Sequence, residues 1–195
     1  NGLVDGDTSK PAFRFSSDAS LRLAHDLRAN SMAILVGVGT VIRDDPSLTV
    51  RGPDIDPREQ PTRVVIDPNG RIPAESKLLQ DGEAPTLIIQ SSKFDTNGDG
   101  GHVERIIVQE QEIPVSRILD LLGDRGIQSL LVEGGPETWS RFLSSGMVNR
   151  ARVCVSPIQL DGDGLLFDRG LLSEHMSLIS ESEVSGDSIE WWIRN

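Results

Sequence analysis

The chain has 195 residues, a formal net charge of −11 and one cysteine, Cys154. The length favours a single domain over residues 1–195. The lone thiol rules out an internal disulfide or a multi-cysteine zinc site. No apolar run approaches the roughly 20 residues of a membrane span. The acidic balance argues against nucleic acid as a partner, because such binding neutralises phosphates with Lys and Arg, so any phosphorylated ligand must meet a local basic spot. We expect a cytoplasmic protein, and a single cysteine is compatible with a reducing compartment.

Hydrophobic spacing predicts the elements in chain order. A helix is expected over residues 17–29, capped by Ser17 or Asp18. Short apolar runs bounded by turn residues predict strands over residues 33–36, 62–66, 86–90 and 102–108. The chain continues as a helix over 115–122, which Ser116 can cap, a strand over 129–132, a helix over 137–145, and strands over 150–156 and 188–194. Strands that alternate with helices indicate an α/β fold of three layers, with helices on both sides of a mostly parallel central sheet.

Two glycine-containing corners follow predicted strands. Residues 37–40 (Gly-Val-Gly-Thr) come directly after the first strand, where glycines let a backbone approach a ligand. This is not the dinucleotide fingerprint, because Ile42 replaces the third glycine. Residues 133–136 (Glu-Gly-Gly-Pro) follow another strand, at the sheet edge where open α/β sheets bind ligands. From the residues alone, a tight structural turn explains each corner about as well as a ligand site does.

Charged side chains near these corners are the candidates for chemistry. Glu133 would repel a phosphate, so we expect it to face a sugar hydroxyl or the reacting substrate. Asp44 and Asp45 are candidates for acid/base work, for metal ligation or for turn formation, and no further carboxylate or His spacing supports a metal. Arg28 and Arg51 can each offer a bidentate fork to phosphate, although residue type alone favours surface charges.

No motif predicts a metal site or a role for a histidine. Residues 95–100 imitate the start of a calcium loop, but its twelfth position is Ile106 in place of Glu. The three histidines are far apart in sequence and are expected on the surface or on a helix face, namely His25, His102 and His175. Trp191 and Trp192 adjoin on a strand, so one side chain faces in and one out, with packing as the default and a dimer contact as the alternative.

Longer segments carry a resemblance that no short motif carries alone. Residues 27–51, 63–67, 131–136 and 146–157 closely resemble the reductase domain of riboflavin biosynthesis, and the similarity covers almost the whole chain. The resemblance implies a dihydrofolate-reductase-like fold and a homodimer. It also implies NADPH-dependent reduction of the ribosyl group of a (di)aminopyrimidine ribosylamine 5′-phosphate to a ribityl chain.

The resemblance further implies roles for individual residues. Glu133 is the expected catalytic acid/base residue. The expected cofactor contacts are Gly39, Thr40, Asp44, Gly134, Gly135 and Pro136. The expected substrate contacts are Arg14, Ser16, Arg28, Leu48, Arg51 and Glu133, with Arg28 and Arg51 taking the phosphate. The family normally begins with a Lys-bearing strand; Asn1 and Gly2 look like the remnant of the turn after it, so the chain is expected to lack that strand.

Two other functions fit the same residues. One is a dihydrofolate or dihydropterin reductase of the same fold, although the pair Arg28 and Arg51 favours a phosphorylated substrate. The other is a non-catalytic nucleotide-binding or oligomerisation module, which the missing first strand makes plausible. NADPH binding with or without turnover separates these alternatives.

Overall fold

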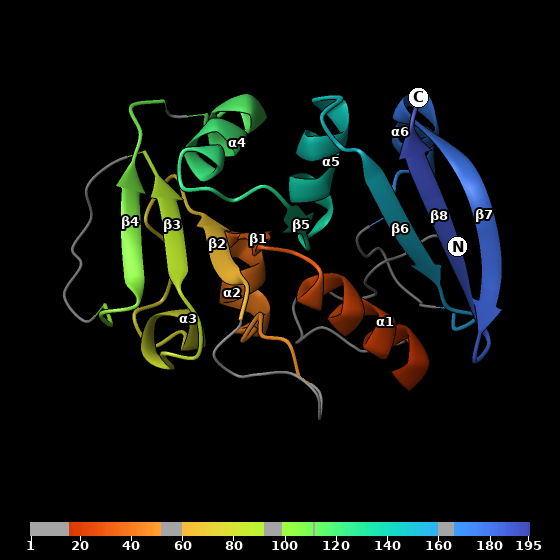
Figure 1. Ribbon diagram of the computed structural model, residues 1–195, viewed down its shortest axis with the longest axis horizontal. Coiled ribbons are helices and arrows are strands. Elements are labelled where there is room, and N and C mark those ends of the chain that lie inside the picture. The colour runs from red at the N-terminus through yellow and green to blue at the C-terminus, as the bar shows by residue number, and fades with distance from the viewer. Residues whose placement is uncertain (1–15, 52–59, 92–98, 111, 160–165) are drawn as a thin grey trace. The chain divides into compact units, whose positions relative to one another are not determined.

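The computed structural model describes residues 16–51, 60–91, 99–110, 112–159 and 166–195. The chain divides into two compact units, each with its own sheet (Figure 1). Residues 25–138 form the parallel-sheet unit, and residues 1–24 with 139–195 form the antiparallel-sheet unit. No helix in the described part of the chain is long and apolar enough to cross a membrane.

The parallel-sheet unit is built on five strands in the order β4-β3-β2-β1-β5, all parallel to their neighbours. The strands are β1 (Ala33–Gly37), β2 (Thr62–Ile66), β3 (Thr86–Gln90), β4 (Val103–Ile107) and β5 (Leu130–Val132). Each was predicted within one or two residues of these bounds. The mostly parallel α/β architecture is therefore confirmed, with a central sheet flanked by helices.

Continuous apolar runs explain why these strands form a buried sheet. Residues 33–36 of β1 are all 0% exposed, and every residue of β3 is buried. Burial of both faces is typical of parallel sheets, whose crossover helices cover them. Side chains from β1, β2 and β3 pack with those of two short helices in a cluster that comprises Ile34, Val36, Val38, Val41, Leu48, Val65, Leu78, Leu79 and Ile88.

The helices of this unit differ in part from the prediction. Helix α4 (Val115–Gly123) is confirmed, but Ser116 does not cap it. The N-cap is Pro114, whose fixed φ and missing N–H place it at the boundary, so Ser116 falls inside the first turn. A helix, α2 (Val38–Asp44), follows β1 directly, and its residues Val38 and Val41 are buried on one helical face. Helix α3 (Lys77–Gln80) has only four residues, too few for a periodic signal.

The antiparallel-sheet unit contains three strands in the order β6-β8-β7. Strands β6 (Arg150–Val155) and β8 (Asp187–Arg194) were predicted, whereas β7 (Met176–Val184) and helix α6 (Arg169–His175) were not. Most of β7 is exposed and polar, so it lacks the apolar alternation of a half-buried strand. Trp192 packs against the core cluster of this unit, and the guanidinium carbon of Arg152 lies 5.5 Å from the ring centre of Trp191. Both indoles are half-buried, and the expectation that one faces in and one faces out stays a prediction.

The start of helix α1 (Asp18–Ala29) is stabilised by a capping serine and by a buried carboxylate. Ser17 Oγ accepts a hydrogen bond from Ser20 N at 3.2 Å, which confirms Ser17 as the cap. Asp187, 2% exposed, accepts from Ser17 N at 2.8 Å and from Ser20 Oγ at 2.6 Å. Burial by itself would raise the pKa of Asp187, but the hydrogen bonds from Ser20 and Ser17 outweigh it and hold that pKa below its ordinary value.

Candidate active site

The strand order of the parallel sheet reverses at β1. From β1 the chain proceeds through β2, β3 and β4 on one side, and it returns to β5 on the other (Figure 1). Leu35 of β1 pairs with Val132 of β5, and Glu133 N donates to Leu35 O at 2.9 Å, so pairing continues one residue past β5. Both glycine corners therefore leave the sheet side by side. Ligands of open α/β sheets bind at the carboxyl ends of strands where the order reverses.

Thr138 in α5 (Pro136–Ser144) lies against both corners. A Cβ added to Gly37 would lie 2.6 Å from Thr138 Oγ1, and one added to Gly134 would lie 2.5 Å from Thr138 Cβ. Neither position has room for a side chain, so packing against α5 explains these two glycines.

Gly39 and Gly135 are surrounded differently. Apart from its own helix backbone and chain neighbours, no atom lies within 4 Å of a Cβ added to Gly39, and beyond its chain neighbours the nearest atom to one on Gly135 is Thr40 Oγ1, at 4.0 Å. Their open backbone brings one glycine of each corner, together with the Thr40 hydroxyl, to a surface that a ligand can approach. Pro136 occupies the first helical position of α5, where its missing N–H costs nothing.

The contact between Gly37 and Thr138 can be tested by mutation. Gly37→Ala is expected to lower the free energy of unfolding by about 1–3 kcal/mol, because the new methyl group overpacks the corner. In a Thr138→Ala background the cost should largely vanish, because the Oγ1 atom is gone and Thr138 Cβ lies 4.0 Å from the added methyl. Urea unfolding of the two single variants and the double variant measures this coupling.

Gly134→Ala serves as the matched control. Its methyl would meet Thr138 Cβ itself at 2.5 Å, so Thr138→Ala should not rescue it. Equal costs for Gly37→Ala in both backgrounds would contradict the assignment of Gly37 to this contact.

A bidentate ion pair lies beside the second corner. Arg28, in the last turn of α1, donates from Nε to Glu133 Oε1 at 2.8 Å and from Nη2 to Oε2 at 2.6 Å. Arg28 Nη1 also donates to Thr49 O at 3.1 Å. The two side chains are 20% and 26% exposed, so the carboxylate is oriented yet still reachable. Arg28 thus ties three elements together: α1, the residue after β5 and the segment after α2.

The segment that carries Arg51 is fixed along its length. Gln60 accepts from Val50 N at 2.7 Å and donates to Val50 O at 3.1 Å. Arg63 Nη1 donates to Ser47 O at 3.3 Å, and Arg51 Nη2 donates to Ser47 Oγ at 3.1 Å. Arg51 itself is exposed. Its guanidinium therefore extends from an anchored backbone and is exposed to solvent.

Leu48 lies in the same segment but within the core. Its side chain is 3% exposed and belongs to the cluster under β1 and β2, and its φ of 49° places the backbone in the left-handed region. This burial explains how the segment is anchored. Contact of Leu48 with substrate stays a prediction.

The two adjacent aspartates separate into different roles. Asp45 has a φ of 39°, its Oδ1 accepts from Lys77 N at 2.9 Å, and its carbonyl accepts from Lys77 Nζ at 2.9 Å. Of the three roles considered for Asp45, which were acid/base work, metal ligation and turn formation, turn formation therefore fits. Asp45 also accepts a hydrogen bond from the first residue of α3. Asp44 ends α2, and its Oδ1 lies 3.9 Å from Arg43 Nε. Its contact with the cofactor stays a prediction.

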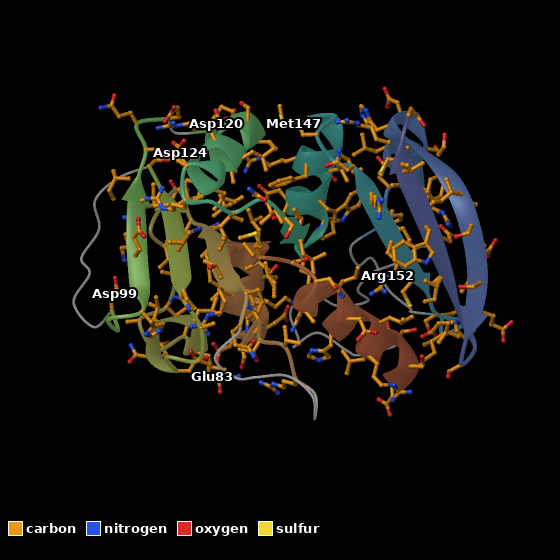
Figure 2. The ribbon with its side chains drawn as sticks, viewed as in Figure 1. Glu83, Asp99, Asp120, Asp124, Met147 and Arg152 are labelled. Atoms are coloured by element: carbon orange, nitrogen blue, oxygen red, sulfur yellow. The ribbon has the colours of Figure 1, made fainter. Side chains whose placement is uncertain are left out.

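Within the described ranges, no group of three His, Cys, Asp or Glu side chains could hold a metal ion. Asp99, which belongs to the calcium-like stretch and is labelled in Figure 2, accepts from Arg105 Nε and Nη2 at 2.6 and 2.8 Å. Residues 95–98 of that stretch lie outside the described residues.

Two further expected substrate residues belong to the other unit of the chain. Arg14 lies outside the described residues. Ser16 belongs to the antiparallel-sheet unit, where its Oγ is 4.0 Å from Cys154 Sγ. Both roles stay predictions.

Several residues of the site escaped the sequence-based interpretation. Arg63, 0% exposed, donates to Asp81, Thr86 Oγ1 and the carbonyl oxygens of Leu78 and Ala84, in addition to Ser47 O. A charged residue within an otherwise buried parallel strand was a signal for such a hub, because a buried charge needs partners. Thr138, Gln60 and His25 carried no such signal.

A sequence profile of the RibD C-terminal domain matches residues 4–189. The chain belongs to the RibD C-terminal domain family. The resemblance drawn from the motifs is thereby confirmed.

Individual relatives of this RibD-family chain are substantially similar to it. It is 38% identical over 167 residues to riboflavin biosynthesis protein RibD of Aquifex aeolicus, which covers 84% of this chain and 45% of that protein. It is 34% identical over 167 residues to the 2,5-diamino-6-ribosylamino-4(3H)-pyrimidinone 5′-phosphate reductase of Archaeoglobus fulgidus, covering 80% of this chain and 75% of the reductase. The chain therefore spans less than half of the first relative and about three quarters of the second.

Solved structures establish the fold. The deaminase/5-amino-6-(5-phosphoribosylamino)uracil reductase of Thermotoga maritima matches with a TM-score of 0.82 at 24% identity, over 100% of this chain and 53% of that one. RibD of Acinetobacter baumannii matches with a TM-score of 0.80 at 23% identity, over 100% of this chain and 55% of the other. The expected fold of the RibD reductase domain is confirmed.

Proposed function

We propose that this protein is an NADPH-dependent reductase that converts the ribosyl group of a (di)aminopyrimidine ribosylamine 5′-phosphate to the ribityl form. The observation that carries the proposal is the bidentate pair of Glu133 and Arg28 at the strand reversal, with the open glycine corner on one side and the segment of Arg51 on the other. The name of the Archaeoglobus fulgidus relative supports this substrate class.

The glycine corners fit a nicotinamide nucleotide. Gly39 and Gly135 offer backbone with no side chain in the way, and Thr40 Oγ1 is a hydroxyl beside them. The nine-residue helix α5 starts at Pro136, which has no N–H, and Thr138 N donates to Gly135 O at 3.0 Å, so the helix favours a pyrophosphate through the positive end of its dipole. We assign Gly39, Thr40, Asp44, Gly134, Gly135 and Pro136 to this cofactor. When bound, it supplies the hydride.

Glu133 and the two arginines are assigned to the substrate. Opening of the ribosylamine breaks the bond between C1′ and the ring oxygen, moves the amine proton to that oxygen and leaves a C1′=N imine. An oriented carboxylate can accept the amine proton and return it to the ring oxygen, which is the role we assign to Glu133. Hydride addition at C1′ and proton addition at nitrogen complete the reduction. Arg28 fixes the carboxylate, and Arg51 presents an exposed guanidinium to the phosphate.

We also propose a homodimer. Leu178, Ile179 and Ile193 of the antiparallel sheet are 46%, 62% and 41% exposed, and β7 is an edge strand. Exposed apolar groups at a sheet edge favour association. Light scattering on the purified chain measures its mass in solution.

A cytoplasmic location stays a prediction.

One assay tests the proposed activity. The purified chain is mixed with NADPH and the phosphorylated ribosylaminopyrimidine, and both NADPH consumption and formation of the ribityl product are followed. We expect turnover with this substrate and none with dihydrofolate. NADPH binding without turnover of either substrate would favour a binding module, and turnover of dihydrofolate would favour the folate-type alternative.

A further inference from the structure

His25 and Arg28 project from the same face of α1, three residues apart, and both form hydrogen bonds with the backbone of residues 49–51. Arg28 Nη1 donates to Thr49 O at 3.1 Å, and His25 Nδ1 accepts from Arg51 N at 3.3 Å. The second contact reaches the residue that the proposed function assigns to the substrate phosphate. His25 is half-buried beside it.

The contact sets the protonation state of the ring. A histidine nitrogen that accepts an N–H bond carries no proton, so His25 is neutral with its proton on Nε2. Burial lowers the pKa of His25, the guanidinium groups of Arg28 and Arg51 lower it further, and the carboxylates of Glu133 and Asp26 oppose the shift without cancelling it. These are the described charged groups that face the ring.

We propose that His25 is a positioning residue: its neutral ring holds the Arg51 backbone in place, and protonation of the ring releases that segment and weakens binding of the phosphorylated substrate. The proposal rests on the proposed function, because it assigns the phosphate to Arg51.

Two effects of protonation oppose each other, and their balance decides the direction. An imidazolium adds a positive charge that attracts a phosphate. It also turns the Nδ1 acceptor into a donor that faces the Arg51 N–H, and it places a third cation beside Arg28 and Arg51. Because Arg51 is exposed, water screens the long-range attraction, whereas the lost contact is local. The loss of the contact with Arg51 N therefore outweighs the added positive charge, and we expect protonation of His25 to weaken binding of the phosphate.

The first test compares wild type with His25→Asn and His25→Ala. Asn carries an acceptor oxygen near the position of Nδ1 and does not titrate, whereas Ala removes the acceptor. The substrate phosphate itself titrates near pH 6 and would change the KM of every variant. The readout is therefore the substrate KM of wild type divided by that of His25→Asn, because the titration of the phosphate cancels in this ratio. Because the pKa of His25 lies below its ordinary value, we expect this ratio to stay nearly constant from about pH 7.5 to about pH 6.5 and to rise about 3-fold or more below about pH 6. At the higher pH, His25→Ala should show a raised substrate KM that His25→Asn rescues, and the KM for NADPH should follow neither change.

A ratio that stays constant, or a His25→Ala variant with an unchanged substrate KM, would overturn the proposal. A ratio that falls at low pH would overturn it as well, because the imidazolium would then bind the phosphate itself.

The second test needs no turnover. In the ligand-free protein, the Arg51 amide resonance should shift with the same midpoint as the His25 ring in an NMR titration, and His25→Asn should abolish that shift. An Arg51 amide that ignores the titration of His25 overturns the positioning role even in an active enzyme. An amide that follows it in a protein without reductase turnover leaves the link between His25 and Arg51 standing and refutes the proposed function instead.

Discussion

Replacing Glu133 with Gln is expected to lower kcat by about 100-fold or more, which is the usual contribution of a positioned acid/base group. The change removes the charge while it preserves the shape, and one amide oxygen can still accept from Arg28. NADPH affinity should stay close to that of wild type, because the glycine corners are untouched. Steady-state kinetics and NADPH titration measure the two quantities separately.

The matched control for this variant is Glu83→Gln. Glu83 is an exposed carboxylate in the turn between α3 and β3 (Figure 2), so the same chemical change there should leave kcat unaltered. A circular dichroism melt checks that Glu133→Gln is folded at the assay temperature. An unchanged kcat in the folded variant would remove Glu133 from catalysis, and a raised substrate KM alone would reduce its role to binding.

The parallel sheet was predictable because local sequence controls it. Each buried strand is a short apolar run bounded by turn residues, as in Ala33–Gly37 and Thr86–Gln90, and neither run needs a distant partner to be recognised. The missed elements lack such a signal. Helix α2 begins within a glycine corner, and β7 exposes mainly polar side chains on an edge. Their conformation is decided by packing and by strand pairing, which are not local properties.

The geometry of the site was predictable only in part. That both glycine corners lie at carboxyl ends of strands followed from the sequence. That they adjoin depends on β5 returning to the far side of β1, and strand order has no local signature. The pair formed by Arg28 and Glu133 joins residues 105 positions apart. It changes the expectation for Arg28, whose guanidinium is bonded to a carboxylate and a carbonyl and so is less available to a phosphate than that of Arg51.

This difference leads to the expectation that Arg51→Ala raises the KM for the phosphorylated substrate about 10- to 100-fold, the loss expected for hydrogen bonds to a charged group. The KM for NADPH should not change. Arg51→Lys should recover part of the loss, because an ammonium keeps the charge but lacks the planar fork. Initial rates over a range of substrate concentrations measure each KM.

The phosphate dependence can be isolated with a second substrate that lacks the phosphate. If Arg51 binds that group, Arg51→Ala should impair the phosphorylated substrate and leave the low activity on the dephosphorylated one nearly unchanged. Arg117→Ala, which removes an exposed guanidinium from α4, should affect neither substrate. Equal losses on both substrates would mean that Arg51 acts by holding its own segment through Ser47. The phosphate would then have to be bound by the remaining N–H groups of Arg28, and the ion pair with Glu133 would link phosphate binding directly to the orientation of the catalytic carboxylate.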